Sequence, residues 1–240
     1  MRSIDLTFLA AAVVLLYLPS VLKGGWLFDD PALTDIEWKF KEGRFRLNYG
    51  PALRADGSPY PVWLQFWNHP RALSMWTFQR TYDCFGFDVR AHRTVNLVLH
   101  LAAGALVYLI ARERLTGGSL STLAAGIFLL HPLQVSAVAY VSARPSILAA
   151  VFAFTGVYCW GTGFPWAALI AQFLAQKSKE DSWLYILSWP LALFWFGRIS
   201  DITEVLYWGS ASVLILILLL YRLFFRERRI ASLNIGDTGR

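Results

Sequence analysis

The chain has 240 residues, of which 56% are hydrophobic and only 16% are charged, and its formal net charge is +6. A soluble domain carries about 25% charged residues, and a disordered chain could not leave so much apolar surface in water. Composition therefore excludes a disordered chain and disfavours a soluble globule. The apolar residues form long runs, and at roughly 20 residues for each helical span the chain has room for about six or seven. We expect an all-α, polytopic membrane protein.

The first apolar run extends from Leu6 to Leu22. A cleaved signal peptide would have a shorter apolar core and a cleavage site with small residues. We therefore expect residues 1–23 to form a retained transmembrane helix. Residues 24–93 mix acidic, basic, proline and tryptophan side chains, and no part of this stretch can span a bilayer. This composition is typical of the membrane–water interface and predicts a long extracytoplasmic loop with short interfacial helices.

Residues 94–225 are predicted to form the bundle of transmembrane helices, and residues 226–240 a polar tail. The expected spans are Thr94–Ala111, Leu120–Leu133, Ile147–Trp160, a fifth segment at Pro165–Ala175, Trp183–Phe196 and Val205–Phe225, with Val135–Ser142 as a short interfacial segment. The fifth segment is too short to cross alone, so the count stays open between six and seven.

Orientation follows from the short loop that contains Arg112 and Arg114. Basic residues in short loops favour the cytoplasmic side, which places the N-terminus inside and the long loop outside. With six spans the basic segment Arg226–Arg229 also lies inside, whereas with seven it lies outside, against the rule. The remaining positive charge is dispersed among apolar runs, so we expect contacts with anionic lipid headgroups and no nucleic-acid partner.

Ionisable groups near a membrane are candidate functional residues. Asp29 and Asp30 are adjacent just after the first span, and repulsion between them can keep one carboxylate available as a base or let both face a divalent cation. Asp-Pro also occurs in turns and helix caps, which is the alternative interpretation. No other metal site is expected.

His92, Asn96 and His100 are spaced so that they share one helix face. This polar stripe either forms hydrogen bonds with neighbouring helices or lines a polar cavity.

His131 and Arg144 are expected at the same membrane face. Pro132 should end the helix at His131, and a guanidinium at Arg144 could bind a phosphate or simply extend to lipid headgroups. Lys179 and Glu180 return to this face if the fifth segment crosses. They would complete a phosphate pocket or lie in a solvated loop.

The order of these motifs resembles that of the integral-membrane glycosyltransferases of the GT-C fold. The chain looks most like the membrane part of the transmembrane O-mannosyltransferases with TPR repeats. The resemblance covers roughly residues 24–182 and is carried by Phe28-Asp29-Asp30-Pro31, by Arg71 with Thr77-Phe78, by Phe85-Gly86-Phe87-Asp88, by His92, Asn96 and His100, by His131-Pro132 with Val138 and Arg144, and by Ser178-Lys179-Glu180.

The resemblance implies an inverting transfer of a sugar from a polyprenyl-phosphate donor to a hydroxyl acceptor outside the cytoplasm, in a bacterial inner membrane. It makes Asp29 the general base, with Asp30 beside it. Arg144 and Lys179 would hold the donor phosphate, Glu180 would orient Lys179, and His131 would contact the phosphate or the sugar. No cofactor is implied beyond the possible cation at the Asp pair.

Some residues depart from the family pattern. Ala72 replaces a proline, Asp181 follows Glu180 where an apolar residue is expected, and the chain stops soon after that motif. The alternative is therefore a non-catalytic accessory subunit, derived from such an enzyme and packed with other membrane protein subunits.

Overall fold

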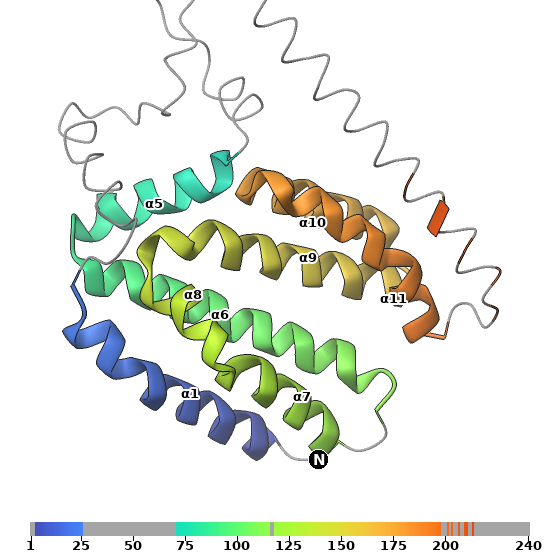
Figure 1. Ribbon diagram of the computed structural model, residues 1–240, viewed down its shortest axis with the longest axis horizontal. Coiled ribbons are helices and arrows are strands. Elements are labelled where there is room, and N and C mark those ends of the chain that lie inside the picture. Colours follow the sequence, from blue (N-terminus) through green and yellow to red (C-terminus); the bar gives the residue numbers. More distant parts are fainter. Residues whose placement is uncertain are drawn as a thin grey trace, which may run out of the picture.

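A computed structural model describes residues 3–25, 71–115 and 118–197, together with 201, 203, 206, 209, 210 and 213. Within these residues every regular element is a helix, which confirms the all-α class (Figure 1). The elements are α1 (Ser3–Lys23), α5 (Ala72–Phe85), α6 (Val89–Arg112), α7 (Gly118–Leu130), η1 (Pro132–Gln134), α8 (Val135–Ala139), η2 (Val141–Ala143), α9 (Arg144–Thr162), α10 (Pro165–Ser178), η3 (Glu180–Ser188) and α11 (Trp189–Trp195).

The helices run side by side, with α6 and α9 in the middle of the bundle. Helices α1 and α7 cover one side of them, while α5 and α10 meet end to end on the other (Figure 1). A hydrogen bond of 2.7 Å from Ser74 Oγ to the Ser178 carbonyl joins these two ends. Small buried residues such as Ala103, Ala153 and Ala168 allow the helices of the bundle to pack closely.

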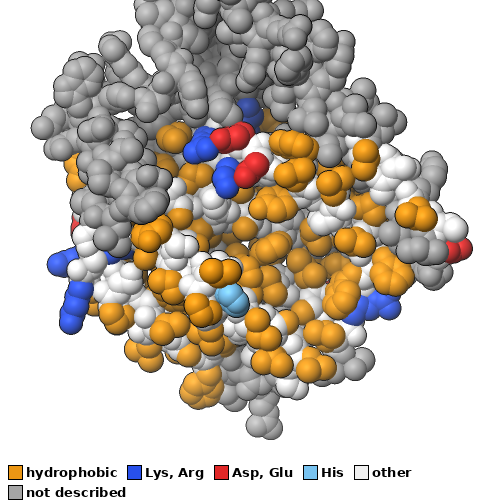
Figure 2. All heavy atoms as spheres, in the orientation of Figure 1, with side chains coloured by type: hydrophobic (Ala, Val, Ile, Leu, Met, Phe, Trp, Pro, Cys, Tyr) orange, Lys and Arg blue, Asp and Glu red, His pale blue; other side chains and the backbone are white. Residues whose placement is uncertain are grey.

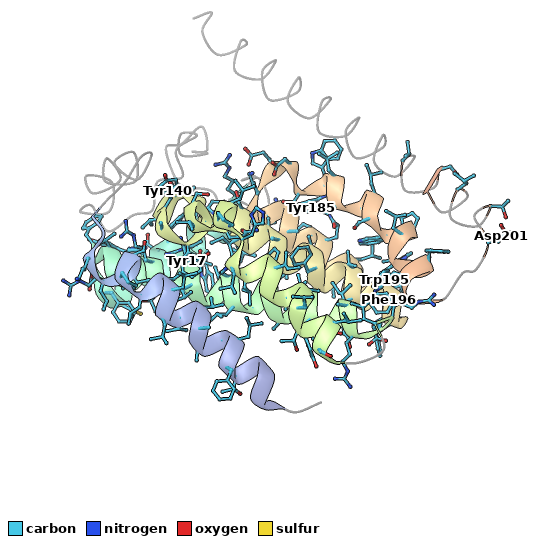
Figure 3. The ribbon with its side chains drawn as sticks, turned by 60° about the horizontal axis from the view of Figure 1, so that its bottom comes forward. Tyr17, Tyr140, Tyr185, Trp195, Phe196 and Asp201 are labelled. Carbon is cyan, nitrogen blue, oxygen red and sulfur yellow. The ribbon has the colours of Figure 1, made fainter. Side chains whose placement is uncertain are left out.

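Contacts at the two ends of the bundle show that successive helices alternate in direction. At one end, the start of α6 lies against the last turn of α1, where Arg93 donates to the Ser20 carbonyl at 2.6 Å. At the other end, the end of α6 meets the end of α11, where Trp195 Nε1 donates to the Ile110 carbonyl at 2.8 Å. Figure 3 shows Tyr140 near the first end and Trp195 with Phe196 at the second.

Local sequence explains where these helices begin and end. The Asp88 carboxylate accepts a hydrogen bond of 2.9 Å from the Arg90 amide and caps α6, as aspartates commonly do. Gly86, just before it, has a φ of +62°, which favours glycine. Pro132 has no N–H group, so α7 ends at Leu130 and the chain bends by 51° into the short helices of residues 132–139.

Within the described residues, two helices are long and apolar enough to cross a membrane, namely α6 and the continuous segment Val141–Thr162. The bent pair of α7 with residues 132–139 makes a third if it counts as one span. The part of α1 from Thr7 to Lys23 is apolar but shorter. A count of six or seven spans is not confirmed, and the predicted span Val205–Phe225 lies outside the described residues, except for a few isolated positions.

Several boundaries differ from those expected. Helix α6 begins at Val89, so the end of the expected loop is already helical. Helix α5, of 14 residues, lies in the part of the chain where a loop with short helices was expected. The charged run beginning at Lys177 does not end α10 at once, since the helix continues to Ser178. Lysine is a good helix former, and the Lys177 ammonium lies over the Phe173 ring, with Nζ 5.7 Å from the centroid.

Close packing between α6 and α7 predicts a large effect for a small change at Gly104. A methyl group at this position would lie 2.5 Å from Leu129 Cγ, and that leucine is buried. We expect Gly104→Ala to destabilise the protein by about 1–3 kcal/mol, the usual range for overpacking. Gly156→Ala on α9 is the control, because its methyl group would meet only contacts of 3.6 Å or more. Thermal unfolding in detergent should separate the two variants, and equal melting temperatures would contradict the packing argument.

Candidate functional site

Arg144 is the centre of the largest polar network in the described part of the chain. Its side chain has no exposed surface. Its Nε donates to Asn96 Oδ1 at 3.0 Å, Nη1 to the Thr77 carbonyl and Thr81 Oγ1, and Nη2 to the carbonyl and Nδ1 of His92. A guanidinium has five N–H groups, so each one has a protein acceptor. Arg144 thus binds α5 and α6 to the start of α9.

No carboxylate of the described residues contacts Arg144, although burying a charge without a partner is costly. The positive charge instead faces neutral acceptors and the ring of Phe78, whose centroid lies 4.3 Å from Cζ. Aromatic faces attract a guanidinium at this distance. A donor phosphate could reach Arg144 only by displacing one of its acceptors. Its expected contact with phosphate stays a prediction, while its visible role is to hold three helices together.

The contacts of His92 define its proton position. Arg144 Nη2 can only donate, so His92 Nδ1 is the acceptor of their 3.1 Å hydrogen bond. The proton of the neutral ring is then on Nε2, which lies 3.4 Å from the Gly86 carbonyl. A second proton on Nδ1 would face the guanidinium. These contacts orient the His92 ring, and it connects Arg144 to the turn between α5 and α6.

The other two members of the polar stripe satisfy backbone groups at the break between α7 and α9. Asn96 Nδ2 donates to the Tyr140 carbonyl at 2.8 Å, while His100 Nε2 lies 3.0 Å from the Leu129 carbonyl. The hydroxyl of Tyr17 donates to the same Leu129 oxygen at 3.3 Å. A continuous helix would use these carbonyls internally. The stripe forms hydrogen bonds with neighbouring elements, which is the first of its two expected roles.

Sequence reasoning missed Arg93, which is fully buried one residue after His92. Its guanidinium donates to the carbonyls of Ser20 and Gly25 at the end of α1. The last carbonyls of a helix lack intrahelical donors and need partners of this kind. A basic side chain near a helix C-terminus also interacts favourably with the helix dipole. Two features of the sequence could have indicated this contact. Arg93 is a charged residue directly before the apolar run of α6, and Gly24 and Gly25 leave room beside the end of α1.

Four charged side chains meet where α5 and α10 come together. Arg71 Nε and Nη2 donate to the two carboxylate oxygens of Glu180, both at 2.5 Å, and Lys179 Nζ lies 3.1 Å from Asp181 Oδ2. We call Arg71, Lys179, Glu180 and Asp181 the charged cluster. The hydrogen bonds from Arg71, aided by the positive charges of Arg71 and Lys179, hold the pKa of the Glu180 carboxyl below its usual range. The pair therefore persists to more acidic pH than a free glutamate would allow.

The structure places several of the predicted site residues in two different groups. His92, Asn96 and Arg144 share one buried network, whereas Lys179 and Glu180 belong to the charged cluster. His131 is exposed, and its Nδ1 accepts a hydrogen bond of 3.2 Å from the Leu133 amide, so it caps the turn after α7. Asp29 and Asp30 lie outside the described residues. Among the residues that are described, no group of three or more His, Cys, Asp or Glu side chains could hold a metal ion.

No family model, curated protein or solved structure matches this chain. A function must therefore be inferred from the contacts of its own residues and from the order of its motifs.

Proposed function

We propose that the protein is a GT-C-like glycosyltransferase, which transfers a sugar from a polyprenyl-phosphate donor to a hydroxyl acceptor on the extracytoplasmic side. One observation carries the proposal: motif residues that lie far apart in sequence are connected through one face of α5. Arg71 at the start of that helix contacts Glu180, and Thr77 with Thr81 further along accept hydrogen bonds from Arg144. Such a network would hold the donor-binding residues in fixed positions.

The chemistry requires cations near the donor phosphate, because negative charge grows on that phosphate as the glycosidic bond breaks. Arg71 and Lys179 supply two half-exposed cations at the junction of α5 and α10. Asp29 is the proposed base that takes the proton of the acceptor hydroxyl. The lipid tail of the donor would remain among the exposed apolar side chains of the bundle.

The proposed location is a bacterial inner membrane, with the N-terminus in the cytoplasm and the charged cluster outside. The alternating directions of the helices support a polytopic arrangement, and Arg112 and Arg114 fit the cytoplasmic side. Both arginines lie at the end of α6 that is opposite to His92. Six or seven crossings remain part of this proposal.

A transfer assay with polyprenyl-phosphate sugars tests the proposed function. We expect Asp29→Asn to lower the rate by about 10²–10⁴-fold, the usual contribution of a general base, and Asp30→Asn to lower it less. Asp83→Asn is the control, because Asp83 is an exposed residue of α5 that pairs with Arg80. Transfer that survives both substitutions would remove Asp29 and Asp30 from the mechanism, and no transfer by the wild type with any sugar would reject the enzyme.

A second candidate is a non-catalytic accessory subunit of a membrane complex. The observation in its favour is that all five N–H groups of Arg144 are already bonded to protein acceptors. A residue retained for packing alone would have this environment. Stable co-purification with other membrane subunits, together with absent transfer activity, would favour this candidate over the enzyme.

A further inference from the structure

The charged cluster differs from the Arg144 network in its exposure. Arg71 and Glu180 have side chains that are 40% and 51% exposed, whereas Arg144 is fully buried. Figure 2 shows acidic and basic side chains gathered where α5 and α10 meet, with hydrophobic side chains over much of the rest of this face. An anionic ligand can therefore approach the cluster without opening the bundle.

We propose that Arg71, assisted by Lys179, is the binding site for the phosphate of a prenyl-phosphate lipid, and that Glu180 occupies the phosphate position in the free protein. The inference rests on the proposed function and deepens it, because it assigns donor recognition to Arg71 in place of Arg144.

The geometry of the Arg71–Glu180 pair supports this assignment. Two parallel N–H donors, Nε and Nη2, meet two carboxylate oxygens at 2.5 Å each. A guanidinium binds carboxylate and phosphate oxygens with the same two-pronged arrangement. A phosphate can thus replace the Glu180 carboxylate on Arg71 without a change in the position of the arginine.

The backbone that carries the two cations is held in place. Ser74 and Ser178 are both fully buried, and the hydrogen bond from Ser74 Oγ to the Ser178 carbonyl fixes the start of α5 against the end of α10. Arg71 is three residues before Ser74, and Lys179 directly follows Ser178. The distance between the two cationic side chains is therefore limited by a rigid junction, which is what a binding site requires.

The charge balance of the cluster predicts how it responds to a ligand. Arg71 pairs with Glu180 and Lys179 with Asp181, so the four side chains are neutral together. An anion gains a cation only by displacing a carboxylate. Removing the negative charge of Glu180 should therefore strengthen phosphate binding. If Glu180 instead held the ligand directly, the same substitution would weaken binding.

Apolar side chains suited to a prenyl tail flank the cluster in sequence on both elements. Trp76 of α5 is 52% exposed, and Leu184 and Tyr185 of η3 are 47% and 41% exposed. Each follows the cluster within one or two helical turns. A ligand that combines a phosphate with an apolar chain fits this surface better than a free phosphate does.

The test uses the full chain in nanodiscs of zwitterionic lipid, titrated with farnesyl phosphate, with tryptophan fluorescence as the readout. We expect saturable binding of farnesyl phosphate and none of farnesol. Arg71→Gln should weaken binding by about tenfold or more, as expected for loss of a two-pronged contact. Arg80→Gln removes an equal charge from the same helix and should leave the affinity unchanged, because Arg80 contacts Asp83 and the Trp76 ring and no residue of the charged cluster. Glu180→Gln should tighten binding severalfold.

The double variant Arg71→Gln/Glu180→Gln tests whether a loss of binding comes from misfolding. It removes both charges of the Arg71–Glu180 pair, so neither charge remains without its counterpart. This variant should still unfold in one cooperative transition, which shows that it is folded, and should still fail to bind. The proposal is overturned if Arg71→Gln or the double variant binds like Arg80→Gln. It is also overturned if inorganic phosphate binds as tightly as farnesyl phosphate, or if nanodiscs with phosphatidylglycerol suppress binding, since either result would identify a general anion or headgroup site.

The same variants separate this inference from the proposed function. If Arg71-dependent binding is found but no sugar is transferred, the site stands and the enzyme assignment fails. If sugar is transferred and Arg71→Gln changes neither farnesyl phosphate binding nor the KM for the donor, the enzyme stands and this site fails.

Discussion

Replacing Arg144 by lysine is expected to lower the free energy of unfolding by about 2–6 kcal/mol. A lysine ammonium has three donors, so at least two of the five acceptors around Arg144 would lose their hydrogen bond. Each acceptor that stays buried without a partner costs roughly 1–3 kcal/mol. Arg144→Ala should be at least as destabilising, because it removes all five hydrogen bonds of the guanidinium and opens space beside Phe78. Thermal unfolding in detergent measures both effects.

Arg112→Lys provides the matched control for this substitution. Arg112 lies in the last turn of α6 and is exposed, so the same chemical change should leave the melting temperature nearly unaltered. Equal melting temperatures for Arg144→Lys and Arg112→Lys would show that the five hydrogen bonds around Arg144 contribute little to stability. Stability would then not explain why Arg144 is buried, and binding of a ligand would be the remaining explanation.

Much of the helical framework could be predicted from apolar runs. The cores of α1, α6 and α9 coincide with expected spans, because an uninterrupted apolar run of this length has few alternatives to a helix. The end of α7 was also predicted, since Pro132 removes the N–H group that a continuing helix needs. The continuation of α10 past Lys177 was missed, because a charged residue marks the membrane surface without ending the helix itself.

The site was harder to predict, and the polar stripe of α6 explains why. The spacing of His92, Asn96 and His100 predicts a shared face but not the groups opposite to it. Those groups are backbone carbonyls between Leu129 and Tyr140, and they are available only because the chain bends at Pro132. A polar atom on a helix face can bind such a carbonyl or a ligand equally well, so only the tertiary structure distinguishes the two.

The contacts of helix α5 could not be predicted from the motif residues that it contains. Arg71, Ser74, Phe78 and Thr81 recur at helical spacing, and they face α10 at one end and Arg144 at the other. In the sequence these residues lie in a polar stretch that was expected to be a loop with short interfacial helices. Their partners are 63 to 109 residues away, beyond the reach of any local pattern.

Gly24→Ala is the second substitution for which we expect a large loss of stability. A methyl group on Gly24 would lie 2.6 Å from Arg93 Cζ and 2.7 Å from the Ser20 carbonyl oxygen. The fully buried guanidinium would have to move away, and the Ser20 and Gly25 carbonyls would lose its hydrogen bonds. Losing two hydrogen bonds from a charged group, at roughly 1.5–3 kcal/mol each, gives a loss of about 3–6 kcal/mol. The neighbouring Gly25→Ala should be nearly neutral, because nothing lies within 4 Å of its added methyl group.

A double-mutant cycle with Arg93→Ala tests whether this loss acts through Arg93. Once the guanidinium is absent, Gly24→Ala has only the contact with Ser20 left to disturb, so it should cost at least about 1 kcal/mol less than in the wild type, a coupling typical of residues in contact. Thermal unfolding of the four proteins in the same detergent gives this coupling. If the two losses simply add, the glycine acts through the backbone of α1 alone, and Arg93 does not hold the end of α1 against α6.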